Sequence, residues 1–238
     1  MFYKAACLFE DDLIKPRLFL KIEGNGGVNG NHMNAPWDIL LNGNSNFSSI
    51  DYTLHKDFWN MSDIGEVPLN DLIRVSELIV KADAVGKKVV LVGNGGSAAM
   101  ASHVAVDLVK AAGIRAINFN EADLITCFSN DFGYERWVEK ALEFYADDGD
   151  LVILISSSGQ SKNILNGAEK ALSLGLDLVT FSGFSENNPL RALGRINFWA
   201  NSQSYNHVEM THHVWLVAVI DFIIEKKLKV EQITQSVT

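Results

Sequence analysis

Two segments of the chain share one pattern, in which an apolar run ends abruptly in a polar turn and a helical pattern follows. In the downstream segment, Leu151–Ile155 is continuously apolar, and Ser156-Ser157-Ser158-Gly159-Gln160-Ser161 comes directly after it. A short continuous apolar run is typical of a strand that is buried on both faces, as in a parallel sheet. A strand, a polar turn and a helix in this order form an anion site, because free backbone N–H groups and the helix dipole point at one place.

The upstream segment has a glycine-rich turn. Lys88–Val92 predicts a buried strand, Gly93-Asn94-Gly95-Gly96 forms the turn, and a helical pattern runs over Ser97–Lys110. The spacing Gly93-x-Gly95-x-x-Ala98 fits a dinucleotide-binding loop, but no acidic residue clearly ends the next strand and the turn lacks the lysine of a P-loop. A dinucleotide-dependent enzyme is one alternative, and glycines that only allow close packing are another. We expect the two turns to hold a small phosphorylated ligand between them.

Regular helix and strand patterns alternate from Leu69 onward, which favours an α/β protein with a parallel sheet covered on both faces. In such proteins ligands bind at the carboxyl ends of the strands beside a topological switch point, and both polar turns follow strands. The predicted helices are Leu69–Val85, Ser97–Lys110, Glu121–Phe128, Tyr134–Tyr145, Asn163–Leu174 and Val208–Lys227, and the predicted strands are Lys88–Val92, Arg115–Phe119, Leu151–Ile155, Leu178–Phe181 and Ile196–Ala200.

Composition narrows the classes of partner. The 238 residues carry a formal net charge of -9, which argues against nucleic acid and means that local donors must hold any phosphate. Two distant cysteines, Cys7 and Cys127, give no disulfide framework and suit a reducing cytoplasm. The longest apolar stretch, Val214–Ile224, is interrupted by Asp221 and is too short to span a bilayer. We therefore expect a cytoplasmic protein without a membrane partner.

The N-terminal part of the chain differs from the rest. Gly24–Asn31 is rich in glycine and asparagine and is typical of a flexible linker. His32-Met33 is also what a common cloning junction encodes, so the first 32 residues are either native or the product of such a junction or of a misplaced start. We expect an N-terminal extension at residues 1–46 and one domain at residues 47–238.

Three motifs in order resemble the sugar isomerase (SIS) domain family, and within it the phosphoheptose isomerases that act on sedoheptulose 7-phosphate. They are Val92–Ala98 followed by His103, then Ser129-Asn130-Asp131-Phe132-Gly133, then Ile155–Ser161. The resemblance spans roughly residues 69–227. It implies a flavodoxin-like three-layer α/β/α sandwich with a five-stranded parallel sheet, assembled as a homotetramer.

The resemblance also implies a substrate and a set of binding residues. The substrate is a phosphorylated sugar, whose ketose and aldose forms interconvert through an enediol as a base and an acid move one proton between neighbouring carbons. A heptose for bacterial surface polysaccharide such as lipopolysaccharide is the expected product. The serine turn would hold the phosphate, the glycine turn would line the sugar, and the middle motif would close over it; the residues are Ser156, Ser157, Ser158 and Ser161, then Asn94, Gly95, Gly96 and Ser97, then Asn130 and Asp131.

The family carries a histidine and, four residues later, a glutamate on its first helix, and here these positions are His103 and Asp107. The spacing places both on one helical face. By this resemblance Asp107 is the base, and His103 orients a hydroxyl, donates a proton or holds a metal. In the alternative, His103 is a core histidine and Asp107 pairs with Lys110 on the surface.

The last helix departs from the family, whose glutamine and histidine fall at Val208 and Leu216 here. Neither residue can bind a metal or move a proton. Glu209 matches a family glutamate and lies four residues before His213, so the two either rebuild the site or form a surface pair. Zinc accepts such ligands, which gives His103, Asp107, Glu209 and His213 as a candidate set, with Asp107, His103 and Glu209 as the catalytic candidates. The loss at Val208 and Leu216 also favours a non-catalytic SIS module that senses a sugar phosphate.

Overall fold

The computed structural model describes residues 68–237 and the side chains of residues 68–228. The predicted extension at 1–46 and the start of the domain at 47 lie outside this range. In chain order the elements are α3 (Leu69–Ala84), β1 (Val89–Gly93), α4 (Gly96–Lys110), β2 (Ala116–Asn118), α5 (Ala122–Phe132), a 3-10 turn (Tyr134–Arg136), α6 (Trp137–Tyr145), β3 (Leu151–Ser156), α7 (Lys162–Ser173), β4 (Asp177–Ser182), a 3-10 turn (Pro189–Ala192), β5 (Ile196–Trp199) and α8 (Tyr205–Val237).

The five strands form one parallel sheet in the order β2-β1-β3-β4-β5, which confirms the predicted α/β fold. The chain leaves β1 toward β2 on one side and returns to β3 on the other, so the connections diverge between β1 and β3. Gly93 at the end of β1 pairs with Ile155 near the end of β3. Both polar turns therefore emerge side by side at the switch point, where α/β proteins bind ligands.

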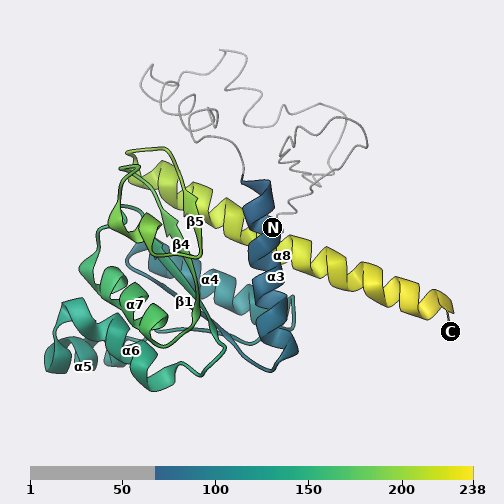
Figure 1. Cartoon of the computed structure of the whole chain (residues 1–238), viewed down its shortest axis with the longest axis horizontal. Coiled ribbons are helices and arrows are strands. Elements are labelled where there is room, and N and C mark those ends of the chain that lie inside the picture. The colour runs from purple at the N-terminus through teal and green to yellow at the C-terminus, as the bar shows by residue number, and fades with distance from the viewer. Residues whose placement is uncertain (1–67, 238) are drawn as a thin grey trace, which may run out of the picture. The chain divides into compact units, whose positions relative to one another are not determined.

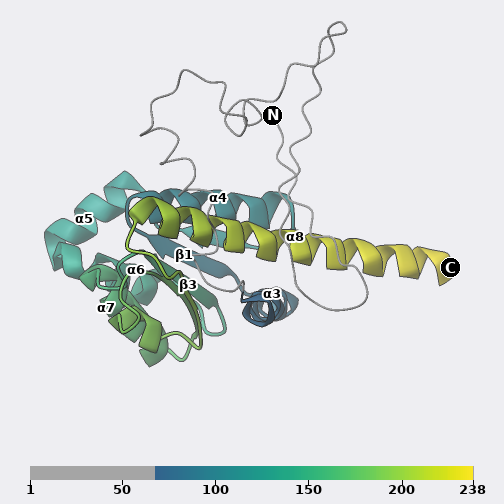
Figure 2. The same cartoon turned by 90° about the horizontal axis from the view of Figure 1, so that it is seen from above.

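Strand residues alternate between two helical layers. Val89 and Leu91 pack into a cluster with α3, α4 and α8, whereas Val90 and Val92 pack into a cluster with α6 and α7. Figures 1 and 2 show these helices on opposite faces of the sheet. Because side chains of a strand alternate in direction and both faces are covered, the strands read as continuous apolar runs.

Three helices differ from the prediction. The helix predicted over Tyr134–Tyr145 is a 3-10 turn over Tyr134–Arg136 followed by α6. The predicted break before Gly133 is absent: α5 continues through Asn130 and Asp131 to Phe132 and stops where Gly133 adopts a φ of 88°. No residue of α5 is buried, so a polar pair on its surface does not interrupt it. The last helix is longer than predicted, 33 residues instead of ending at Lys227, and its carboxyl-terminal half extends past the sheet (Figure 1).

Within the described residues, one helix segment, Tyr205–Leu228, is long and apolar enough to cross a membrane by length and composition. Its buried apolar side chains, Val208, Trp215, Leu216, Val219, Ile220 and Ile223, belong to the core between α3, α4 and the sheet. These side chains explain part of the apolarity of α8 by its place in the core of the domain.

Candidate functional site

The serine turn connects the carboxyl end of β3 to the first residue of α7. The Ser156 hydroxyl donates to Ser161 Oγ over 3.2 Å, and the Gln160 N–H donates to Ser158 Oγ over 3.2 Å. Ser157 is only 5% exposed, and its Oγ has no hydrogen-bond partner in the described part of the chain. No side chain caps α7, so N–H groups of its first turn are also available. A buried hydroxyl without a partner beside a helix N-terminus is a feature that a bound anion would satisfy.

Asn188 packs against Gly159 and thereby fixes the shape of the serine turn. Gly159 has a φ of 64°, and a Cβ at this position would overlap the side chain of Asn188. Asn188 is buried; its Nδ2 donates to the Ser185 carbonyl over 2.8 Å, and its Oδ1 accepts from the Arg191 N–H over 3.0 Å. Sequence reasoning missed this residue because it lies about thirty positions from the turn and belongs to no motif.

The glycine turn is tied to the serine turn by a pair of asparagines. Asn94 Nδ2 donates to Asn163 Oδ1 over 3.0 Å, and Asn163 Nδ2 donates to Asn94 Oδ1 over 2.9 Å. Asn163 lies on α7 and is buried, so it holds the ends of β1 and β3 together. Its place two residues after the serine turn was the only sequence signal for this role. Ser97, expected to contact substrate, is buried and packs behind Gly93.

A carboxylate already lies at the N-terminus of α4. A Cβ on Gly96, the first residue of α4, would overlap the Glu209 carboxylate, so Glu209 of α8 reaches directly onto the glycine turn. A negative charge is stabilised at a helix N-terminus, and it repels a second anion there. The glycine turn therefore suits the neutral part of a ligand and the serine turn its phosphate. This placement also disfavours the dinucleotide alternative, which needs a pyrophosphate at α4.

His103, Asp107 and His213 form a linked row between α4 and α8. His103 Nδ1 lies 2.9 Å from His213 Nε2, and His103 Nε2 lies 3.1 Å from Asp107 Oδ2. His103 is 53% exposed on its side chain, which excludes the alternative of a core histidine. Burial lowers the pKa of His213, and the neighbouring His103 lowers it further while Asp107 opposes the shift. His213 therefore favours the neutral state at neutral pH.

The candidate zinc ligands do not converge. Zinc ligands lie about 2 Å from the ion and close to one another. Here the two ring nitrogens of His103 face different partners, His213 and Asp107. Among the described residues no three His, Cys, Asp or Glu side chains gather in a way that could hold a metal ion. Val208 and Leu216 are buried in the core, so α8 offers no ligand from the family's two positions. The donor set does not fit the expected zinc site.

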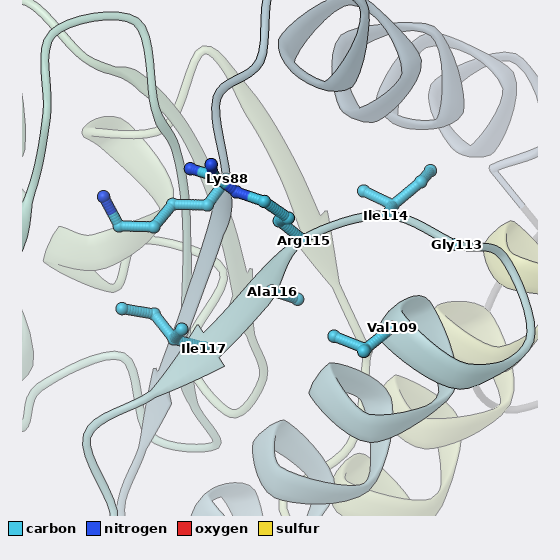
Figure 3. A pocket seen from close by; sticks show the side chains of 7 residues that line it. All are labelled: Lys88, Val109, Gly113, Ile114, Arg115, Ala116 and Ile117. Carbon is cyan, nitrogen blue, oxygen red and sulfur yellow. The ribbon is translucent and has the colours of Figure 1, made fainter.

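Asn130 and Asp131 are exposed on α5, where Asn130 Nδ2 donates to Asp131 Oδ1 over 2.8 Å. The only other side-chain bond of this pair in the described part of the chain is the one from Cys127 Sγ to Asp131 Oδ2 within α5, so neither residue is bonded to either turn. A pocket of about 380 Å³ lies at the opposite, amino-terminal end of the strands (Figure 3). It contains none of the predicted site residues; it is lined by Lys88, Val109, Gly113, Ile114, Arg115, Ala116 and Ile117. Both polar turns lie at the carboxyl end of the sheet, away from this pocket.

The fold and the site define a doubly wound α/β protein with two polar turns at its switch point. A family model described as SIS domain matches residues 61–183, which is just over half of the chain. The chain therefore belongs to the SIS domain family, as the three motifs predicted.

Its relatives include phosphoheptose isomerases. The enzyme so named from Sulfurimonas denitrificans is 31% identical over 166 residues, covering 67% of this chain and 84% of that protein. The one from Clostridium acetobutylicum is 36% identical over 116 residues, covering 46% of this chain and 59% of that protein. A solved phosphoheptose isomerase from Neisseria gonorrhoeae shares the fold with a TM-score of 0.67 at 19% identity, covering 74% of this chain and 98% of that chain.

Proposed function

We propose that this protein is a sugar-phosphate aldose–ketose isomerase of the phosphoheptose isomerase type, which converts sedoheptulose 7-phosphate to a heptose 7-phosphate through an enediol. The observation that carries the proposal is the serine turn, whose buried Ser157 hydroxyl has no partner among the described residues. The relatives named phosphoheptose isomerase support the same reaction type.

In this proposal the ligand lies across the switch point. Its phosphate binds at the serine turn through Ser156, Ser157, Ser158 and Ser161, and its sugar lies along Asn94, Gly95 and Gly96. Glu209 supports this orientation because its carboxylate lies against Gly96. His103, Asp107 and Glu209 form the region of proton transfer, and Asn130 and Asp131 close over the sugar.

The proposal extends to the setting of the protein. We place it in the cytoplasm as a homotetramer that supplies a heptose for surface polysaccharide. The six buried apolar residues of α8 and the exposed valines of α4 are compatible with helices that pack both within and between subunits.

A turnover assay with sedoheptulose 7-phosphate tests the proposal. Isomerisation is expected. The free sugar should bind the wild-type protein much more weakly than sedoheptulose 7-phosphate does. The double variant Ser156→Ala/Ser158→Ala should bind sedoheptulose 7-phosphate much more weakly than the wild type does. Ser173→Ala, at the other end of α7, is the matched control because its hydroxyl bonds only to the Lys170 carbonyl. Tight phosphate-dependent binding without turnover would instead support a SIS sensing module. Equal affinity for phosphorylated and free sugar would contradict both.

A further inference from the structure

We propose that His213 is the group that takes and returns the proton during isomerisation, and that Asp107 acts as a positioning residue through His103. This inference rests on the proposed isomerase activity. It departs from the family pattern, in which the last helix acts through other positions, and from the direct role that the sequence predicted for Asp107.

The hydrogen-bond partners fix the direction of the row. A carboxylate only accepts, so the His103 nitrogen that faces Asp107, Nε2, carries the proton. The other His103 nitrogen, Nδ1, is then an acceptor and receives the N–H of His213 Nε2 over 2.9 Å. This leaves His213 Nδ1 as the nitrogen with a free lone pair. Asp107 thereby sets the tautomers of both rings, as second partners of functional histidines commonly do.

The order of groups along the two helices agrees with these roles. Glu209 lies at the first residue of α4, His213 is one turn later on α8, and Asp107 lies one turn beyond His103. Figure 2 shows α4 and α8 side by side on one face of the sheet. A sugar that enters from the glycine turn meets Glu209 and the imidazoles before it reaches Asp107, which is about 16 Å along the helix from Gly96.

The proposed step conserves protons and electrons. His213 Nδ1 takes the proton from carbon 1 of the ketose, the C–H electron pair forms the C1=C2 bond, and the carbonyl oxygen at carbon 2 takes a proton from water. The enediol then loses the hydroxyl proton at carbon 1 to water as C1=O forms, and carbon 2 takes the proton back from His213. While His213 is charged, its Nε2–H still donates to His103, and Asp107 stabilises the positive charge across the row.

The titratable groups that act on His213 are His103 and Asp107, both on α4. Because Asp107 raises the pKa of His213, Asp107→Asn should lower this pKa further. Imidazole ¹⁵N–¹H spectra over a pH titration of the full chain measure this shift and identify the protonated nitrogens. A His213 ring protonated at Nδ1 in the neutral state would overturn the proposed row.

Kinetics of His213→Gln provide the second test. Glutamine retains an N–H for His103 but cannot transfer a proton, so kcat should fall about 10²–10⁴-fold while KM changes little. Exchange of substrate carbon-bound protons with deuterated solvent should fall in parallel. Lys227→Met is the matched control, because it removes other polar contacts of α8, the 2.8 Å bond from Lys227 Nζ to the Ala112 carbonyl just after α4 and the ion pair with Asp83 of α3, without touching the row.

The outcomes separate this inference from the proposed function. If the wild-type chain isomerises a sugar phosphate and His213→Gln does so within threefold, the row is overturned and the isomerase stands. Activity that a chelator removes and zinc restores would overturn the row in favour of a metal site. If the wild type turns over no sugar phosphate, the proposed function fails and the row has no catalytic role.

Discussion

At the scale of single residues, two adjacent histidines of α8 have different environments. His213 is half-buried between the helices, whereas His212 is fully buried, and its Nε2 donates to the Ser182 carbonyl over 2.9 Å. Its Nδ1 has no partner within the described residues, so a second proton would place an unpaired charge in the core. Burial accordingly lowers the pKa of His212 from 6.5 to about 4.

This difference predicts acid sensitivity. Since the folded pKa lies below the unfolded one, His212 contributes stability that is present above pH 6.5 and is lost as the pH falls toward about 4. The loss amounts to about 3 kcal/mol in the free energy of unfolding. Urea unfolding at a series of pH values measures it, and His212→Gln, which keeps a donor for Ser182, should flatten the dependence between pH 6.5 and 4. An unchanged slope in this variant would contradict the assignment.

At the scale of elements, the contact between α4 and α8 makes a prediction about Gly96. Alanine at this position would overlap the Glu209 carboxylate, so Gly96→Ala should destabilise the protein by about 1–3 kcal/mol. In a Glu209→Ala background the overlap is gone, and the same substitution should be neutral to slightly stabilising because alanine favours helix over glycine. Denaturant unfolding of the four proteins gives the coupling free energy. Additive effects would show that the two residues do not touch.

The elements were also the level at which sequence reasoning succeeded. Apolar runs such as Leu151–Ile155 predicted the strands because a parallel sheet is buried on both faces, and alternation with helices predicted its covering layers. The pairing of Asn94 with Asn163 and the support of Gly159 by Asn188 were beyond prediction. These contacts join distant residues, and short-range periodicity carries no information about them. Which turn of α8 contacts α4 likewise depends on how the two helices pack. This packing places His213 beside α4 and buries Leu216 in the core.

At the scale of the whole molecule, two large apolar side chains lie exposed on the outer surface of α4. Val106 is 57% exposed and Val109 is 51% exposed, and Val109 also lines the pocket of Figure 3 beside Ile114 and Ile117. Contiguous exposed apolar surface of this kind commonly marks an interface between proteins. The carboxyl-terminal half of α8 extends past the sheet (Figure 1).

We therefore expect sedimentation at micromolar concentration to show a homotetramer, and Val106→Lys/Val109→Lys to shift it toward smaller species. Burying two lysines in an apolar interface is unfavourable because the charges lose hydration without gaining partners. Leu172→Lys is the matched control: Leu172 is also apolar and exposed but lies on α7, which covers the other face of the sheet. At equal subunit concentration, the free energy of unfolding of each variant should stay close to that of the wild type after correction for the free energy of assembly. A wild-type chain that sediments as a monomer, or a double variant that assembles as the wild type does, would show that the valines of α4 do not join subunits.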